Sequence, residues 1–174
     1  MKGDKNYIFI PVSRLALKEG FSIIEAVVAS AILAVGIAGI VGVFAAYERA
    51  AGDAVSSTQA MLLAEEGLEA TLIERDSSWS TTLGSYSLGT PYFLVWNAGA
   101  NTWNMTTAGS EVDNTYYRTV TFSSVYRDAN DEITTSGGTL DPKTLLATVV
   151  VAWLKNGSTS TVSESEYVND LFGN

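Results

Sequence analysis

The chain has 174 residues, a formal net charge of −9, and neither cysteine nor histidine. These absences exclude cysteine–histidine nucleophile pairs, histidine-bearing triads and ordinary zinc sites, and leave paired carboxylates as the main route to hydrolysis. The first twenty residues carry a net charge of +2, so the rest of the chain carries −11. An acidic body argues against nucleic-acid binding, which needs clustered Lys and Arg. We therefore expect neither an enzyme nor a nucleic-acid-binding protein.

The N-terminal half begins with a basic segment and continues with a long apolar run. Residues 1–20 are predicted to be a leader, because Pro11 interrupts them and basic residues stand at both ends. The run from Ala26 to Ala46 is long enough, as a helix, to cross a hydrocarbon core of ~30 Å. Since the basic leader precedes it and the acidic body follows, we expect residues 21–47 to span the inner membrane once, with the N-terminus in the cytoplasm.

Glu25 is the anomaly at the start of this segment. It stands within Gly20-Phe21-Ser22-Ile23-Ile24-Glu25, directly before the apolar run. A charge inside a membrane segment costs roughly 2.5–3.5 kcal/mol at a helix centre and less near the interface. We therefore expect a compensating partner, although an interfacial Glu that reaches the headgroups would need none. A secretory signal and a simple signal anchor remain alternatives for the segment as a whole.

Small residues recur at every fourth position of the apolar run. Residues at this spacing share a helix face and let another helix approach closely in lipid. We predict helix packing through this series, although Ala and Gly are also simply common in membrane helices. Its members are Ser30, Ala34, Ala38, Gly42 and Ala46, and it continues to Ala50 and Ala54.

Residues 48–76 are predicted to continue the same helix with an amphipathic pattern. No proline occurs between Tyr47 and Asp76. Apolar residues recur at steps of three and four, which predicts a stripe that packs on a partner layer, with the glutamates of this stretch largely off that line. The stripe is formed by Met61, Ala64, Leu68 and Leu72.

Residues 77–174 are predicted to form a small β-sheet head. Residues 91–96 and 116–126 have strand composition, and the apolar run 145–154 reads as a central strand buried on both faces. Asn156-Gly157 predicts a two-residue hairpin that returns through an exposed edge strand at 158–168. We therefore expect an α+β fold in which a long N-terminal helix packs on three or four antiparallel strands, with Trp153 facing that helix.

The N-terminal motif resembles that of type IV pilins and type II secretion pseudopilins. Lys18, Gly20, the aromatic Phe21, Glu25 and the membrane-length run all occur with the family's spacing. Two features depart from the pattern: Glu19 stands beside the cleavage glycine where a basic residue is commoner, and the mid-helix proline of major pilins is absent. The second departure favours a minor subunit slightly.

The resemblance implies a role for each residue of the motif. A prepilin peptidase would cleave after Gly20 and methylate the new N-terminal Phe21, whose α-amine is substantially protonated at neutral pH. Glu25 would pair with the amine of its own chain or of a preceding subunit, and only the second pairing specifies an assembly register. The implied partners are the prepilin peptidase, other pilin or pseudopilin subunits, a membrane assembly platform and membrane lipid, with no cofactor.

The head offers one further candidate site. Acidic and amide side chains cluster around the loop at 128–138 and could hold calcium, although a solvated hairpin end explains them equally well. The cluster consists of Asp128, Asn130, Asp131, Glu132 and Asp141. For the whole chain we expect a filament subunit, held in the inner membrane and then in an extracellular or periplasmic filament. The main alternative is a signal-anchored exported binding domain that never polymerises.

Overall fold

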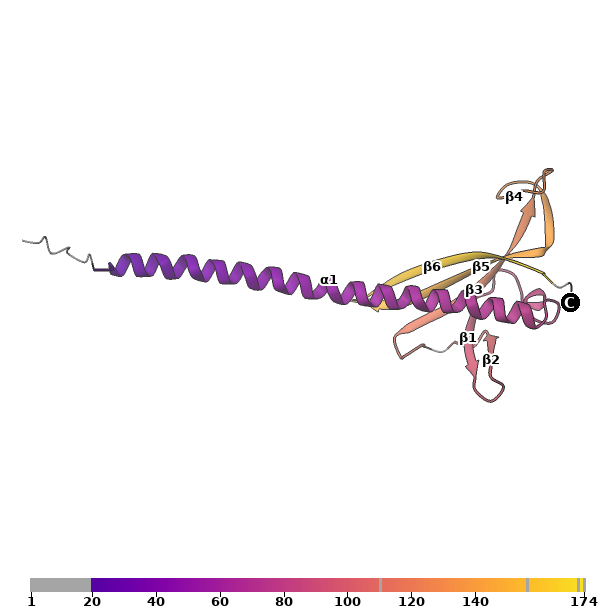
Figure 1. Ribbon diagram of the computed structural model, residues 1–174, viewed down its shortest axis with the longest axis horizontal. Coiled ribbons are helices and arrows are strands. Elements are labelled where there is room, and N and C mark those ends of the chain that lie inside the picture. Colours follow the sequence, from indigo (N-terminus) through magenta and orange to yellow (C-terminus); the bar gives the residue numbers. More distant parts are fainter. Residues whose placement is uncertain (1–19, 110, 156, 172, 174) are drawn as a thin grey trace, which may run out of the picture. The chain divides into compact units, whose positions relative to one another are not determined.

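One long α-helix and a six-stranded antiparallel sheet form the α+β fold that the sequence predicts (Figure 1). The computed structural model describes residues 20–109, 111–155, 157–171 and 173, so the predicted leader lies almost wholly outside the described residues. The chain forms two compact units, one ending at Glu48 and the other beginning at Arg49. The elements are α1 (Ile23–Ser77), the 3₁₀ helix η1 (Leu83–Ser85), β1 (Tyr92–Asn97), β2 (Thr102–Thr106), β3 (Tyr116–Arg127), β4 (Ile133–Thr134), β5 (Thr139–Lys155) and β6 (Ser158–Asn169).

The strands follow the order β2-β1-β3-β5-β6, and β4 pairs with the end of β3. β3 therefore occupies the middle of the sheet, whereas the sequence favoured residues 145–154 for that place. β6 is an edge strand, as predicted, and it follows β5 through a two-residue connection, with Lys155 opposite Ser158 in the register. Gly157 in this connection has a φ of 80°, which only glycine adopts at low cost.

The prediction that residues 145–154 are buried on both faces is wrong. Along this part of β5 the buried residues alternate with partly exposed ones, and Leu154 is 72% exposed. The long apolar run is therefore a half-buried antiparallel strand, not the doubly covered strand typical of parallel sheets. Its buried side includes Val149, Val151 and Trp153.

The sheet contains strands that the sequence did not predict. Neither β2 nor β4 was expected, and β5 begins at Thr139, upstream of Pro142. Proline usually ends a strand because it lacks a donor N–H. Here the β3–β5 register shifts between Ser124 and Val125, so that Pro142 faces no residue of β3. The bulge accommodates the proline and lets the strand continue.

The second half of α1 packs on one face of the sheet through small residues. The face that touches the sheet carries Ala60, Ala64, Gly67, Ala70 and Thr71, all of them buried. The predicted stripe is therefore partly wrong, because its bulky members flank this contact. Leu68 and Leu72 are partly buried against the core, and Met61 is 46% exposed.

Two other expectations concern the same face. Glu74 was expected off the apolar stripe but is only 8% exposed, and burial raises the pKa of its carboxyl. Trp153 faces α1, as predicted, and its ring lies 6.0 Å from that of Tyr116. The Tyr116 hydroxyl donates a 2.8 Å hydrogen bond to Gln59 of α1.

Contacts inside this unit fix the direction of the strands along α1. Lys155 pairs with Asp53 at 2.9 Å, and a Cβ added at Gly67 would lie 2.8 Å from Val149. β5 therefore runs antiparallel to the second half of α1, and its neighbours β3 and β6 run parallel to that half (Figure 1).

Candidate functional site: the start of the helix and its exposed apolar run

The motif Gly20–Glu25 lies where the chain enters α1. Gly20, Phe21 and Ser22 precede the helix, which begins at Ile23. The backbone N–H of Ala26 donates a 3.1 Å bond to the carbonyl of Ser22, closing the first helical turn. Phe21 is 73% exposed. The predicted cleavage bond, Gly20–Phe21, therefore lies in exposed, non-helical backbone directly before the helix.

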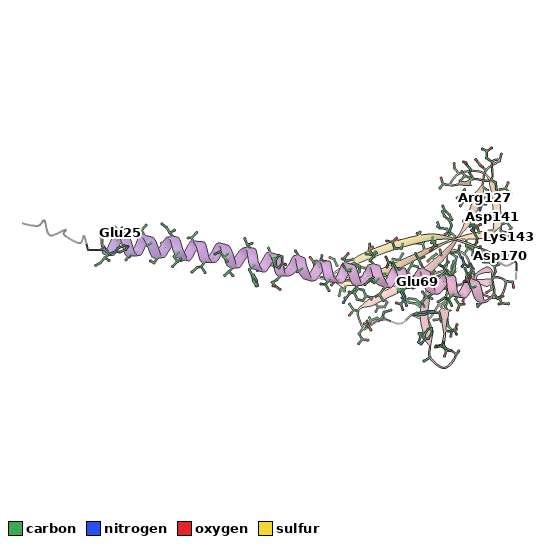
Figure 2. The ribbon with its side chains drawn as sticks, viewed as in Figure 1. Glu25, Glu69, Arg127, Asp141, Lys143 and Asp170 are labelled. Carbon is green, nitrogen blue, oxygen red and sulfur yellow. The ribbon has the colours of Figure 1, made fainter. Side chains whose placement is uncertain are left out.

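Glu25 occupies the first turn of α1, as Figure 2 shows. A carboxylate there interacts favourably with the partial positive charge of the helix N-terminus. Among the residues that the structure describes, Glu25 forms no ion pair. Ser22 and Glu25 also have the spacing of a capping box, a local arrangement that the sequence reasoning did not consider.

The apolar run is helical throughout and lies open in this single chain. Every described residue up to Phe44 is exposed, and the most apolar stretch has a mean hydropathy of 2.6. The helix is therefore long and apolar enough to cross a membrane. Burying this surface in lipid or against other helices would be strongly favourable at about 25 cal/mol per Å².

The predicted packing series lies on this exposed helix. Its members are all exposed, and apart from the adjacent residues and the backbone of the helix itself nothing lies within 4 Å of a Cβ added at Gly42. A shallow hollow of about 560 Å³ is lined by Gly36 and Gly39 with Ile40, Val43 and Phe44 around them. Gly36 and Gly39 were not among the predicted packing positions, although the spacing of the two glycines could have indicated this second surface. The series itself is Ser30, Ala34, Ala38, Gly42 and Ala46.

The head contains a buried cation that the sequence reasoning missed. Arg118 on β3 is 3% exposed, and its Nη1 donates to Glu66 at 2.7 Å and to the Leu63 carbonyl at 3.1 Å. The guanidinium carbon lies 5.2 Å from the centre of the Trp103 ring, within cation–π range. Nε has no hydrogen-bond partner among the described residues. The alternation of β3 could have marked Arg118, since it stands between the inward-facing Tyr116 and Val120.

A second charged cluster lies at one end of the sheet (Figure 2). Arg127 contacts Asp141 at 2.7 Å, and Asp141 also accepts a 2.7 Å bond from the Thr144 hydroxyl. The Arg127 bond, followed by the Thr144 bond, lowers the pKa of Asp141 from 3.8 to about 2. These groups line a hollow of about 540 Å³ with Lys143 and Asp170.

The acidic cluster around the loop at 128–138, weighed above as a possible calcium site, is not assembled as a metal site. In the described part of the chain no three acidic side chains converge as metal ligands. The Asp141 carboxylate accepts a hydrogen bond from Arg127. The Asp128 carboxylate accepts hydrogen bonds from the backbone N–H groups of Glu132 and Asn130. The bond from Glu132, followed by that from Asn130, lowers the pKa of the Asp128 carboxyl. Asp128 therefore stabilises the conformation of the loop.

The tryptophans Trp79, Trp96 and Trp103 differ in their exposure. Trp79 is 8% exposed, and Trp103 packs edge-on against Trp96 with ring centres 5.3 Å apart. Trp96 alone of the three is substantially open, at 47%. The three tryptophans therefore do not form a shared binding surface.

Comparison of the chain with known proteins gives no match to a family model, to a curated protein or to a solved structure. The architecture itself, a long apolar N-terminal helix packed on an antiparallel sheet, is pilin-like.

Proposed function

We propose that this chain is a structural subunit, and specifically a minor subunit, of a type IV pilus-like or type II secretion pseudopilus filament. A prepilin peptidase would cleave the Gly20–Phe21 bond and methylate Phe21. The processed chain would be stored in the inner membrane with its head outside. A membrane assembly platform would then transfer it into a filament, where contacts with other subunits replace contacts with lipid.

The observation that carries the proposal is the geometry at the start of α1. An exposed cleavage bond, a carboxylate in the first turn and an open apolar helix follow one another without interruption. After cleavage Glu25 would lie about one helical turn from the Phe21 amine. Pairing with the amine of a neighbouring subunit would offset the cost of placing the carboxylate in lipid and would set the axial register of assembly.

The capping-box alternative for Glu25 suggests the sharpest experiment. Glutamine also completes a capping box but cannot form an ion pair with an amine. We therefore expect Glu25→Gln to be exported and cleaved normally, and to be lost from filaments as completely as Glu25→Ala. Ser22→Ala removes the N-cap and keeps the carboxylate, so it should still be incorporated.

The readouts are the mass of the membrane-fraction protein and its amount in sheared filaments. Normal incorporation of Glu25→Gln would overturn the pairing role and leave a local cap as the function of Glu25. Absence of the wild-type chain from every filament fraction would favour an anchored exported binding domain instead.

A further inference from the structure

A connecting segment folds back over the C-terminal end of α1. This segment, residues 78–86, follows the last residue of the helix, Ser77, and is called the connector below. The Glu74 carbonyl accepts a 2.7 Å hydrogen bond from the Ser77 hydroxyl, and the Thr82 hydroxyl of the connector lies 2.9 Å from the same carbonyl oxygen. Leu83 of the connector is fully buried. The backbone of Glu74 is therefore the point at which the connector is attached to the helix.

The side chain of Glu74 is buried at this point without a compensating charge. In the described part of the chain its carboxylate forms no ion pair and accepts no hydrogen bond. The cation next to it in the sequence, Arg75, pairs with Asp76 at 2.8 Å. Burying an ionised carboxylate without such partners is costly, whereas burying the neutral acid costs much less.

Glu74 also lies at the end of α1 that disfavours a negative charge. The helix ends at Ser77, so Glu74 belongs to its last turn, where the free carbonyl groups carry a partial negative charge. Burial raises the pKa of the Tyr86 phenol in the connector, and the nearby charge of Glu74 raises it further. Burial likewise raises the pKa of the Glu74 carboxyl. Burial, helix position and the absence of a partner therefore all favour the protonated form of Glu74 in the closed structure.

The sheet residues around the connector bring no cation to Glu74. Phe122 of β3 stacks on the Tyr86 ring, and Tyr92 of β1 lies next to Tyr86 with ring centres 4.7 Å apart. On β5, Asp141 lines a hollow of about 270 Å³ with Tyr86, and it forms an ion pair of its own. Between about pH 4.5 and pH 7.5 the two phenols stay neutral, and Asp141, whose pKa is lowered to about 2, stays ionised. Among these groups, only Glu74 changes its charge in that range.

We propose that Glu74 is a pH-sensitive latch, which holds the connector on the end of α1 while its carboxyl is protonated and loosens the connector when the carboxyl ionises. In the open form the ionised side chain reaches water, which removes the cost of burying its charge. Because folding raises the pKa of Glu74, the closed form is most stable below the unfolded value of 4.5 and loses stability as the pH rises through the folded value. The latch belongs to the head alone and depends on neither the cleavage nor the assembly proposed above.

Hydrogen–deuterium exchange of the full chain in detergent, followed by mass spectrometry at about pH 4.5 and pH 7.5, tests the latch. After correction for the intrinsic exchange rate, the peptide that contains the connector should exchange at least about three-fold faster at the higher pH. Peptides of β3 should show no such change, because the core of the head stays closed. Equal corrected rates for the connector at the two pH values, or the same acceleration in β3, would overturn the proposal.

A pair of variants assigns the effect to Glu74. Glu74→Gln keeps the size of the side chain and removes its charge, so its connector should exchange at both pH values at the slow rate that the wild type has at the lower pH. Glu69→Gln is the matched control, because Glu69 is an exposed glutamate of the same helix (Figure 2). This control should keep the pH dependence of the wild type. A pH dependence that persists in Glu74→Gln would assign the effect to another group and contradict the latch.

Discussion

Arg118 shows how one side chain connects the two layers of the head. It extends from β3 to the helix, where Glu66 and the Leu63 carbonyl accept its hydrogen bonds. Because Arg118 is buried and Glu66 is 44% exposed, the two partners are not equivalent. Removing Glu66 leaves a buried cation with less compensation, whereas removing the cation leaves a carboxylate that water can solvate.

This asymmetry gives a prediction about stability. Glu66→Ala should lower the free energy of unfolding by about 2 kcal/mol, whereas Arg118→Met, which keeps the volume and removes the charge, should change it by less than about 1 kcal/mol. Urea unfolding of the full chain in detergent, followed by tryptophan fluorescence, measures both. A larger loss for Arg118→Met would show that the charge itself stabilises the head.

Asp141 makes the stability of the head depend on acid pH. Folding lowers its pKa from 3.8 to about 2, chiefly through the Arg127 bond, so it stabilises the head above its unfolded pKa. This contribution is lost as the pH falls from about 4 towards 2. Asp141→Asn should therefore cost about 1 kcal/mol at pH 7 and progressively less below pH 4.

The control for this pH dependence is Glu132→Gln, which alters an exposed carboxylate directly before β4. Its unfolding curve should follow that of the wild type from pH 7 to pH 2. If Asp141→Asn loses as much stability at pH 2 as at pH 7, the Arg127–Asp141 pair is not the source of the dependence.

At the scale of elements, the close contact between helix and sheet depends on the absence of a side chain at Gly67. A Cβ at Gly67 would lie 2.8 Å from Cγ1 of Val149, a fully buried side chain that cannot move aside freely. Gly67→Ala should therefore lower the free energy of unfolding by about 1–2 kcal/mol despite the better helix propensity of alanine.

Gly52 is the matched control in the same helix. Apart from the adjacent residues and the backbone of the helix itself, nothing lies within 4 Å of a Cβ added there, so Gly52→Ala should raise the free energy of unfolding by about 0.5–1 kcal/mol. The opposite signs of the two substitutions are the diagnostic result, measured by urea unfolding. A stabilising Gly67→Ala would mean that the two layers are less closely packed than the structure shows.

The elements also show what sequence patterns can and cannot predict. The helix was predicted to its C-terminal end because no proline or turn signal interrupts 47–76. The helix face was placed wrongly at Met61 because hydrophobic periodicity gives weight to large side chains, while the sheet selected the small ones. The start of β5 was missed because Pro142 reads as a strand breaker, and only the bulge opposite it shows why the strand continues.

The candidate site was predictable to a different extent. Gly20, Phe21 and Glu25 were found from their spacing, and the structure places them in order at the start of α1. Their roles remain predictions, because processing and subunit pairing need partners. Arg118 was missed because folding brings together residues that are far apart along the chain, here Arg118 of β3 with Leu63 and Glu66 of α1.

At the scale of the whole molecule, a membrane-length helix and a folded acidic head belong to one chain. Burying the exposed apolar surface of α1 in lipid or against other helices would be strongly favourable. The acidic head suits a solvated position, and it contains its own core of helix and sheet.

The central claim is that the mature chain begins at Phe21. Mass spectrometry of the protein extracted from the membrane fraction tests it most directly. We predict an intact mass and an N-terminal peptide that begin at Phe21 and carry one methyl group on the α-amine. A membrane-embedded chain that still begins at Met1, or one cleaved after the apolar run, would contradict it.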